Sequence, residues 1–268
     1  MEERPYKDIL YKYRSWDETT GYQKKILTER QLYFAAPSQF NDPFDCALPF
    51  RYDPKELTDD QVFLKLQDVI SKAHPDKSAQ EIHDICYREQ QEGHLKDPDY
   101  WRNYHREFKD KVDNTFGIVS LTSKPDNILM WSHYADCHRG FCVGFNGDIL
   151  YETVGGGIGH VIYSNIFPYT KLFDDAEIVI RHLNTKSPDW EYEDEYRITK
   201  HGYSGKVVTL PPEAYKEIVI GCKATQKTIE QILKTVDDHL PSTKVYMATQ
   251  SDEAFKVNIY SSNLFLKL

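Results

Sequence analysis

The sequence predicts an α+β fold in which a mixed or antiparallel sheet forms the core and carries a helical insertion. Short segments with alternating large side chains, typical of strands, occur towards both ends of the chain, whereas residues 57–114 carry helical patterns. We find no internal repeat and no low-complexity linker in the 268 residues. We therefore predict a single domain, residues 1–268, with residues 55–114 as the insertion.

Several segments have the β-branched and aromatic content of strands and are bounded by turn residues. They span residues 9–14, 31–36, 116–121, 141–145, 160–163, 191–200, 215–220, 244–248 and 255–260. Outside the insertion, helices are predicted over residues 21–30, 130–135, 172–183 and 225–240. The glycine-rich run 155–159 lacks the Lys-Ser/Thr of a phosphate loop, so we interpret it as a flexible hairpin.

The insertion is predicted to contain three helices. Thr58 with Gln61, and Ser78 with Glu81, have the spacing of a capping box, in which each residue satisfies a backbone N–H of the other. Pro98 suits the first turn of a third helix, where a missing N–H costs nothing.

Bulk composition limits the class of protein and its partners. Hydrophobic residues make up 40% and charged residues 28%, which is typical of a soluble globular chain. The net charge of −9 argues against a broad phosphate-binding surface, so nucleic acid is a disfavoured partner, although a local basic cleft stays open. Without a long apolar run, and with five scattered cysteines, we expect a cytoplasmic protein with reduced thiols and no membrane partner.

Residues 190–197 hold the densest group of carboxylates. If they form a strand, Glu191, Glu193, Glu195 and Arg197 share one face. One interpretation is a solvated face with a salt bridge. The other directs Glu193 or Glu195 into a cleft, as an acid, a base or an acceptor for a sugar hydroxyl.

Residues 130–145 are the second candidate for a site. Trp131 and Tyr134 lie three residues apart on a short helix, and we predict that they form one wall of a pocket. After Gly140, residues 141–145 alternate as a half-buried strand does. The stretch also contains His133, Cys137, His138 and Cys142. These lack the compact pairing of zinc ligands, so no metal is expected, and no local charge marks an activated thiol.

Two further segments have both a structural and a functional interpretation. In residues 11–14, Tyr11 and Tyr13 share one strand face, and the opposite face is either the charged outside of an edge strand or places Arg14 against a phosphate. In residues 40–45, Asn41 and Asp42 either close a turn fixed by two core phenylalanines or line a cleft.

The order of these motifs resembles the bacterial domain-of-unknown-function 2971 family over about residues 8–262. The motifs are Leu-Tyr-Lys-Tyr-Arg at 10–14, Phe-Asn-Asp-Pro-Phe-Asp at 40–45, Met-Trp-Ser-His-Tyr-Ala at 130–135 and Glu-Tyr-Arg at 195–197. More distantly, the chain is similar to ADP-ribosyltransferase-like domains, which also begin with a Tyr/His/Arg-bearing strand and end with a glutamate on a late strand.

The more distant resemblance implies NAD as the cofactor and cleavage of its nicotinamide–ribose bond. Tyr13 or Arg14 would face the dinucleotide, with Asn41 beside it, Tyr134 with Trp131 would stack on the nicotinamide, and Glu193 or Glu195 would be the catalytic carboxylate. Such an enzyme would modify a macromolecule in stress or phage defence. Two alternatives remain: a non-catalytic nucleotide- or partner-binding module, and a metal-dependent hydrolase or nuclease that uses the two glutamates.

Overall fold

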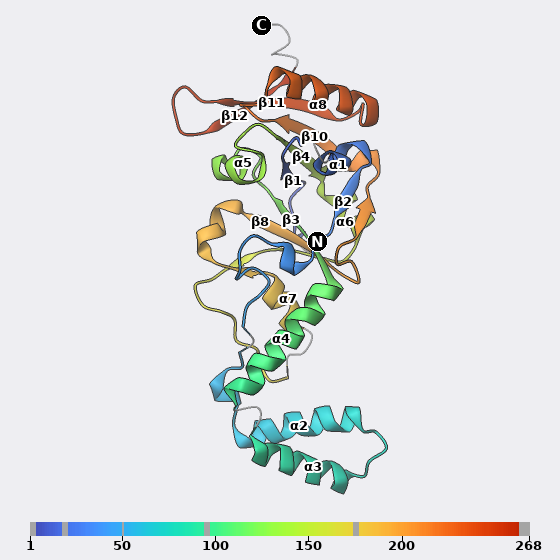
Figure 1. Ribbon diagram of the computed structural model, residues 1–268, viewed down its shortest axis with the longest axis vertical. Coiled ribbons are helices and arrows are strands. Elements are labelled where there is room, and N and C mark those ends of the chain that lie inside the picture. The colour runs from blue at the N-terminus through green and yellow to red at the C-terminus, as the bar shows by residue number, and fades with distance from the viewer. Residues whose placement is uncertain (1–3, 18–20, 50, 94–96, 174–176, 263–268) are drawn as a thin grey trace.

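The computed structural model describes residues 4–17, 21–49, 51–93, 97–173 and 177–262 (Figure 1). Its largest sheet contains the strands β1 (Ile9–Arg14), β3 (Phe116–Thr122), β4 (Phe141–Asn146), β5 (Gly157–His160), β8 (Glu195–His201), β10 (Tyr215–Ile220), β11 (Lys244–Gln250) and β12 (Val257–Ser261). The spatial order is β12-β11-β10-β4-β1-β3-β8-β5, and only β10 and β11 are parallel. The predicted α+β fold with a mixed, mainly antiparallel sheet is confirmed.

Two small sheets and the helices complete the fold. The sheets pair β2 (Gln31–Tyr33) with β9 (Val207–Thr209), and β6 (Ile162–Tyr163) with β7 (Thr185–Lys186). The helices are α1 (Lys25–Thr28), α2 (Asp59–Ala73), α3 (Ala79–Glu92), α4 (Pro98–Thr115), α5 (Ile128–Tyr134), α6 (Gly147–Val154), α7 (Glu177–Leu183) and α8 (Gln226–His239). Short 3-10 turns include η2 (Pro37–Gln39) and η5 (Pro188–Glu193).

Helices cover the central strands on both faces. Leu10 and the odd-numbered residues of β4 pack with α1, α6 and α8, whereas Tyr11, Tyr13 and Cys142 pack with α5 (Figure 1). Two expectations are therefore corrected. The strand 141–145 is buried on both faces, not half-buried, and β1 is a central strand, not an edge strand.

The acidic segment 191–200 is not one continuous strand. Ser187 caps η5 by accepting a hydrogen bond from Asp189 N, and Pro188 occupies the first turn. Asp194 then adopts the left-handed conformation, with φ 46° and ψ 54°, before β8 begins. Glu191 and Glu193 thus lie on a 3-10 helix, and the predicted shared face with Glu195 and Arg197 is wrong.

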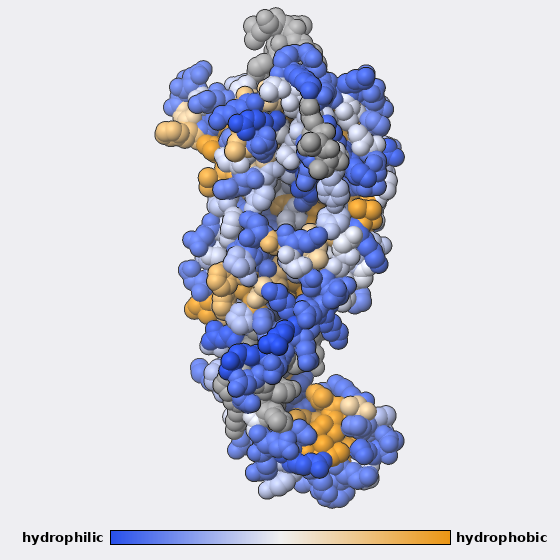
Figure 2. Space-filling view, viewed as in Figure 1, coloured by the Kyte–Doolittle hydropathy of each residue, from blue (hydrophilic) through white to orange (hydrophobic). Residues whose placement is uncertain are grey.

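The three helices predicted within residues 55–114 are α2, α3 and α4. The predicted capping box is complete between Ser78 and Glu81, whereas at the first helix only its first half is seen, with Thr58 accepting from Gln61 N. Helices α2 and α3 pack mainly on each other, at the end of the long axis opposite α8 and β12 (Figure 1). Their surface carries an apolar patch (Figure 2). Leu64 and Val69 of α2 are exposed.

The glycine-rich run does not form the predicted flexible hairpin. Gly155, with φ 64°, ends α6, and residues 157–160 pair with β8 as the edge strand β5. Among the described residues, no helix is both long and apolar enough to span a membrane.

Candidate functional site

The site lies where the large sheet opens between β1 and β3. Strand β1 pairs with β4 along its whole length, but with β3 only through Tyr11 and Thr122. Strand β3 pairs with β8 from Phe116 to Thr122. The two halves of the sheet therefore diverge beyond one shared residue pair, and a cavity of about 240 Å³ occupies the gap.

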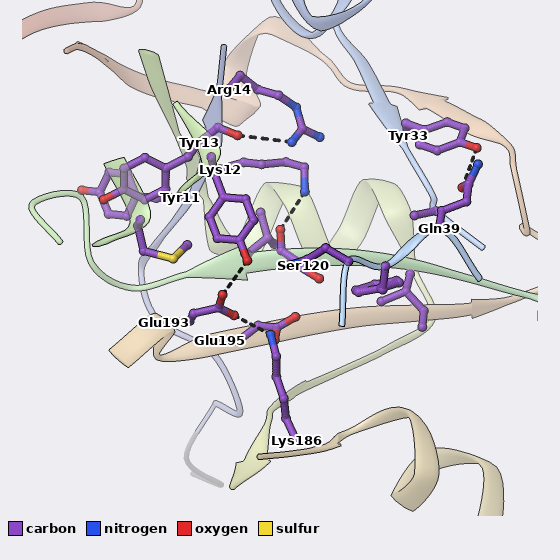
Figure 3. A pocket seen from close by; sticks show the side chains of 17 residues that line it. Tyr11, Lys12, Tyr13, Arg14, Tyr33, Gln39, Ser120, Lys186, Glu193 and Glu195 are labelled. Atoms are coloured by element: carbon purple, nitrogen blue, oxygen red, sulfur yellow. Dashed lines mark hydrogen bonds and ion pairs between the residues drawn. The ribbon is translucent and has the colours of Figure 1, made fainter. Parts of the chain in front are cut away.

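The cavity brings together residues from all four segments singled out in the sequence. Tyr13, Arg14, Asn41, Tyr134, Glu193 and Glu195 all line it. The remaining lining residues are Tyr11, Lys12, Tyr33, Ala35, Gln39, Phe40, Ile118, Ser120, Leu121, Met130 and Lys186. Figure 3 shows Lys12 and Arg14 on one side of the cavity and Glu193, Glu195 and Lys186 on the opposite side.

Trp131 does not line the cavity, so its expected role in stacking a ligand is corrected. Its side chain is fully buried, and the indole Nε1 donates to Pro125 O at 2.9 Å. The ring packs edge-on against Tyr13 at 5.0 Å between centroids. Trp131 therefore supports the cavity from behind, because it fixes the position of Tyr13.

Lys12 and Arg14 form a cationic wall. Within the described residues neither makes a salt bridge to a carboxylate, although the charge of Glu195 raises the pKa of Lys12 and so opposes the effect of burial. Lys12 Nζ donates to Ser120 O at 2.8 Å across the gap, and Arg14 Nη1 donates to Tyr13 O at 3.2 Å. Burial lowers the pKa of Lys12 well below its usual value, with a further contribution from the charge of Arg14. Burial also lowers the pKa of Arg14 to about 10. An anion bound here would favour the charged form of both groups.

Glu193 is the carboxylate best placed to meet a ligand. It ends η5 and is only 3% exposed. Its Oε1 accepts from the Tyr134 hydroxyl at 2.7 Å and its Oε2 from Lys186 Nζ at 2.6 Å. Since each carboxylate oxygen can accept two hydrogen bonds, one acceptor position on each oxygen is left for a ligand.

Glu195 instead accepts three hydrogen bonds from fixed partners. Its Oε1 accepts from Arg197 Nε at 2.8 Å, and its Oε2 accepts from Arg197 Nη2 and Lys186 Nζ, both at 3.0 Å. Arg197 is fully buried and also makes two 2.7 Å hydrogen bonds to Asp45. This ion network joins residues 40–45 to β8, and we expect Glu195 to orient Lys186 and Arg197, with Glu193 facing the ligand.

The buried network carries one more negative than positive charge. Asp45, Glu193 and Glu195 are acidic, and Lys186 and Arg197 are basic. Burial raises the pKa of Glu193, although Lys186 and Tyr134 oppose this effect. Burial alone would also raise the pKa of Glu195, but the charges of Arg197 and Lys186 lower it to about 2. The two glutamates thus have pKa values shifted in opposite directions, an arrangement found in many acid–base sites.

The loop 40–45 combines the two interpretations proposed for it. Asp42 accepts from Phe44 N at 2.9 Å, so it closes the turn, while Asn41 lines the cavity. Of the two phenylalanines, Phe40 is partly buried and covers the Arg197 guanidinium at 5.3 Å, whereas Phe44 is 59% exposed. Only one of the two rings therefore acts as a core anchor.

Sequence reasoning missed Lys186, which contacts both glutamates. The only local signal was indirect: three glutamates within residues 191–195, if buried, need a buried cation close by. Lys186 also argues against the metal-dependent hydrolase or nuclease. Its ammonium lies between three carboxylates and so occupies the position where a divalent cation would bind. Within the described ranges, no group of three or more His, Cys, Asp or Glu side chains could hold a metal ion.

The sequence also allows a nucleophilic Cys137 or Cys142 with His133 or His160 as its base, and three strands separate Cys142 on β4 from His160 on β5. Cys142 is fully buried in the core beneath α5, and burial raises its pKa well above the usual value. His160 instead contacts Asp194, with Nε2 at 2.9 Å from Oδ1.

The fold and the site define an α+β protein with a cavity that presents Lys12 and Arg14 on one side and carboxylates on the other. Residues 130–198 match the family described as Protein of unknown function (DUF2971), so the resemblance to this family is confirmed over that segment. The segment includes Tyr134, Lys186, Glu193, Glu195 and Arg197. No curated protein and no solved structure shows significant similarity to the chain.

Proposed function

We propose that the chain is an NAD-using enzyme of the ADP-ribosyltransferase type, with its nucleotide in the cavity between β1, β3 and β8. The observation that carries this proposal is the placement of Lys12 and Arg14 opposite Glu193 across one cavity. NAD has the matching parts, because its pyrophosphate is anionic and its ribose hydroxyls are hydrogen-bond donors. A cavity of this size would hold one end of the dinucleotide, with the remainder at its opening.

The cationic wall would hold the pyrophosphate. The Arg14 guanidinium presents a planar fork that can bind two phosphate oxygens, and Lys12 adds a point charge beside it. Because burial lowers the pKa of both groups, a bound phosphate would offset their desolvation and their mutual repulsion. Asn41 and Tyr33 line the same cavity and could contact the nucleotide.

Glu193 would act on the ribose that carries the nicotinamide. Its free acceptor positions suit a ribose hydroxyl, and its negative charge would stabilise the positive charge that develops on the ribose as the bond to nicotinamide breaks. Tyr134 and Lys186 hold the carboxylate in place. The acceptor then bonds to the ribose carbon and releases its proton, while nicotinamide leaves with the bonding electron pair. A macromolecular target and a role in stress or phage defence are further parts of this proposal.

Release of nicotinamide from NAD is the expected activity. It can be measured by chromatography after incubating the protein with NAD, alone and with nucleic acid or protein from a cell extract as acceptors. Lys12→Ala should lose the activity, and Glu152→Gln, a substitution on the exposed part of α6, should retain it.

Two results would contradict the proposal in different ways. If NAD or ADP-ribose raises the melting temperature but no nicotinamide appears with any acceptor, the chain is a nucleotide-binding module without turnover. If neither stabilisation nor release occurs, the cavity does not bind this class of nucleotide. Cleavage that a chelator abolishes would instead support the metal-dependent hydrolase.

A further inference from the structure

A second cluster of reactive side chains lies outside the cavity, where the turn after α5 meets the end of β10. It consists of Ser132, His138 and Cys222, none of which lines the cavity. Cys222 Sγ lies 3.7 Å from His138 Nδ1, and Ser132 Oγ lies 3.1 Å from His138 Nε2. Backbone hydrogen bonds hold the two segments together, since Lys223 N donates to His138 O at 2.9 Å and Gly221 N to Gly140 O at 2.9 Å.

The hydrogen bonds define the tautomer of His138. The Ser132 hydroxyl donates its proton to Ile128 O at 2.9 Å, so its oxygen can only accept from His138 Nε2. With the ring proton on Nε2, the neutral imidazole presents a lone pair on Nδ1, and this atom faces Cys222 Sγ. The result is a directed relay from the thiol through the imidazole and the hydroxyl to a backbone carbonyl.

We infer that Cys222 is a nucleophilic thiol, with His138 as its general base, that forms mixed disulfides with low-molecular-weight disulfides. A nucleophile within reach of a base, which is itself oriented by a third group, is the arrangement that activates thiols in many sites. Trp131 stacks on the His138 ring with 6.2 Å between centroids and 15° between planes, which keeps the imidazole in this orientation. This inference does not depend on the proposed use of NAD.

The reaction is a balanced exchange. Cys222 Sγ attacks one sulfur of a disulfide R–S–S–R, its proton moves to His138 Nδ1, and RS⁻ leaves. The proton then passes from His138 to RS⁻, so the products are the Cys222 mixed disulfide and one RSH. The thiol is partly accessible, as attack requires.

The charge states explain why a base is needed. Burial raises the pKa of Cys222, so the thiol is protonated at neutral pH. Burial also lowers the pKa of His138, so the imidazole is neutral and able to take the proton. An exposed thiol without a base reacts in proportion to its thiolate fraction, which rises tenfold per pH unit below a pKa of about 8.5. Assisted attack at Cys222 should vary much less between pH 6.5 and 8.

The chain provides its own comparison thiol, because Cys137 is exposed while Cys46, Cys86 and Cys142 are buried. The full chain is incubated with oxidised glutathione, and the mixed disulfides at Cys222 and Cys137 are timed by peptide mass spectrometry from pH 6 to 8.5. We expect a nearly pH-independent rate at Cys222 and a steeply rising rate at Cys137.

Substitution of the base gives the second measurement. His138→Asn suits the positive φ of 69° at this position and removes the base, so the rate at Cys222 should fall on the order of 100-fold at pH 7, with Cys137 unchanged. The inference is overturned if Cys222 forms no adduct, if its rate follows that of Cys137 with pH, or if His138→Asn leaves it unchanged. The pH comparison uses the unmodified sequence and stands even if the variant does not fold.

Discussion

Arg197→Met is expected to lower the free energy of unfolding by about 3–5 kcal/mol, because it leaves buried carboxylates without their cation. The Arg197 side chain is fully buried and pairs with Asp45 and Glu195. Urea titration followed by circular dichroism measures the loss. Arg139→Met is the matched control, since its contact with Asp136 is 3.5 Å long and exposed, and it should change stability by less than about 1 kcal/mol.

A second substitution separates the ion network from simple packing. If Arg197 acts through its charge, adding Asp45→Asn to Arg197→Met should recover part of the lost stability, because it removes one of the unpaired carboxylates. A loss of less than about 1 kcal/mol for Arg197→Met alone would show that the network does not hold residues 40–45 against β8.

Glu193→Gln is expected to reduce nicotinamide release at least ~100-fold while preserving the fold. The amide can donate to the Tyr134 hydroxyl and accept from Lys186, so both existing contacts survive. The substitution also removes the excess negative charge of the buried network. Stability should therefore change by less than about 1 kcal/mol, and the loss of activity can be assigned to the missing carboxylate charge.

Glu195→Gln is the matched comparison. Both oxygens of Glu195 accept from Arg197, so its amide group would have to face a donor, and we expect this variant to lose stability. Equal stability of the two variants, or full activity of Glu193→Gln, would contradict the division of roles.

A pH profile adds an independent readout. Because the pKa of Glu193 is raised, acidification should begin to reduce wild-type activity at a pH above the ordinary glutamate pKa of about 4.3.

Glu195 should keep the fold stable over the pH range in which Glu193 becomes protonated. Its folded pKa of about 2 lies below the unfolded value of about 4.3, so its ionised form stabilises the fold above that value. This contribution is lost only as the pH falls from about 4.3 towards 2. Activity that declines with Glu193 should therefore do so while the circular dichroism spectrum is still native.

The elements that sequence could predict are those whose signals are local. Thr58 and Ser78 both cap their helices, because each cap depends on residues three positions apart, although the predicted capping box is complete only at Ser78. The segment 191–200 was misread because its alternation fits a strand, while the left-handed turn at Asp194 leaves no trace in that pattern. Ser187 and Pro188 were the available signs of a helical start.

The site could be predicted only in part, because its key contacts are distant in sequence. Arg197 meets Asp45, 152 positions away, and Tyr134 meets Glu193, 59 positions away. Residue type indicated that Glu193 and Tyr134 could form a site, but it could not tell Trp131, which packs in the core, from an aromatic wall. That distinction depends on how α5 lies on β1, which local sequence does not encode.

Calorimetric titration of NAD tests the central claim most directly. NAD should bind to the wild-type chain. Arg14→Gln should lower the affinity at least tenfold, or about 1.4 kcal/mol, because the variant loses the charge that faces the cavity. Arg51→Gln is the control, since Arg51 stacks on Tyr169 outside the cavity, and it should bind as the wild type does. Absence of binding to the wild type, or equal affinity of Arg14→Gln, would contradict nucleotide binding between β1 and β8.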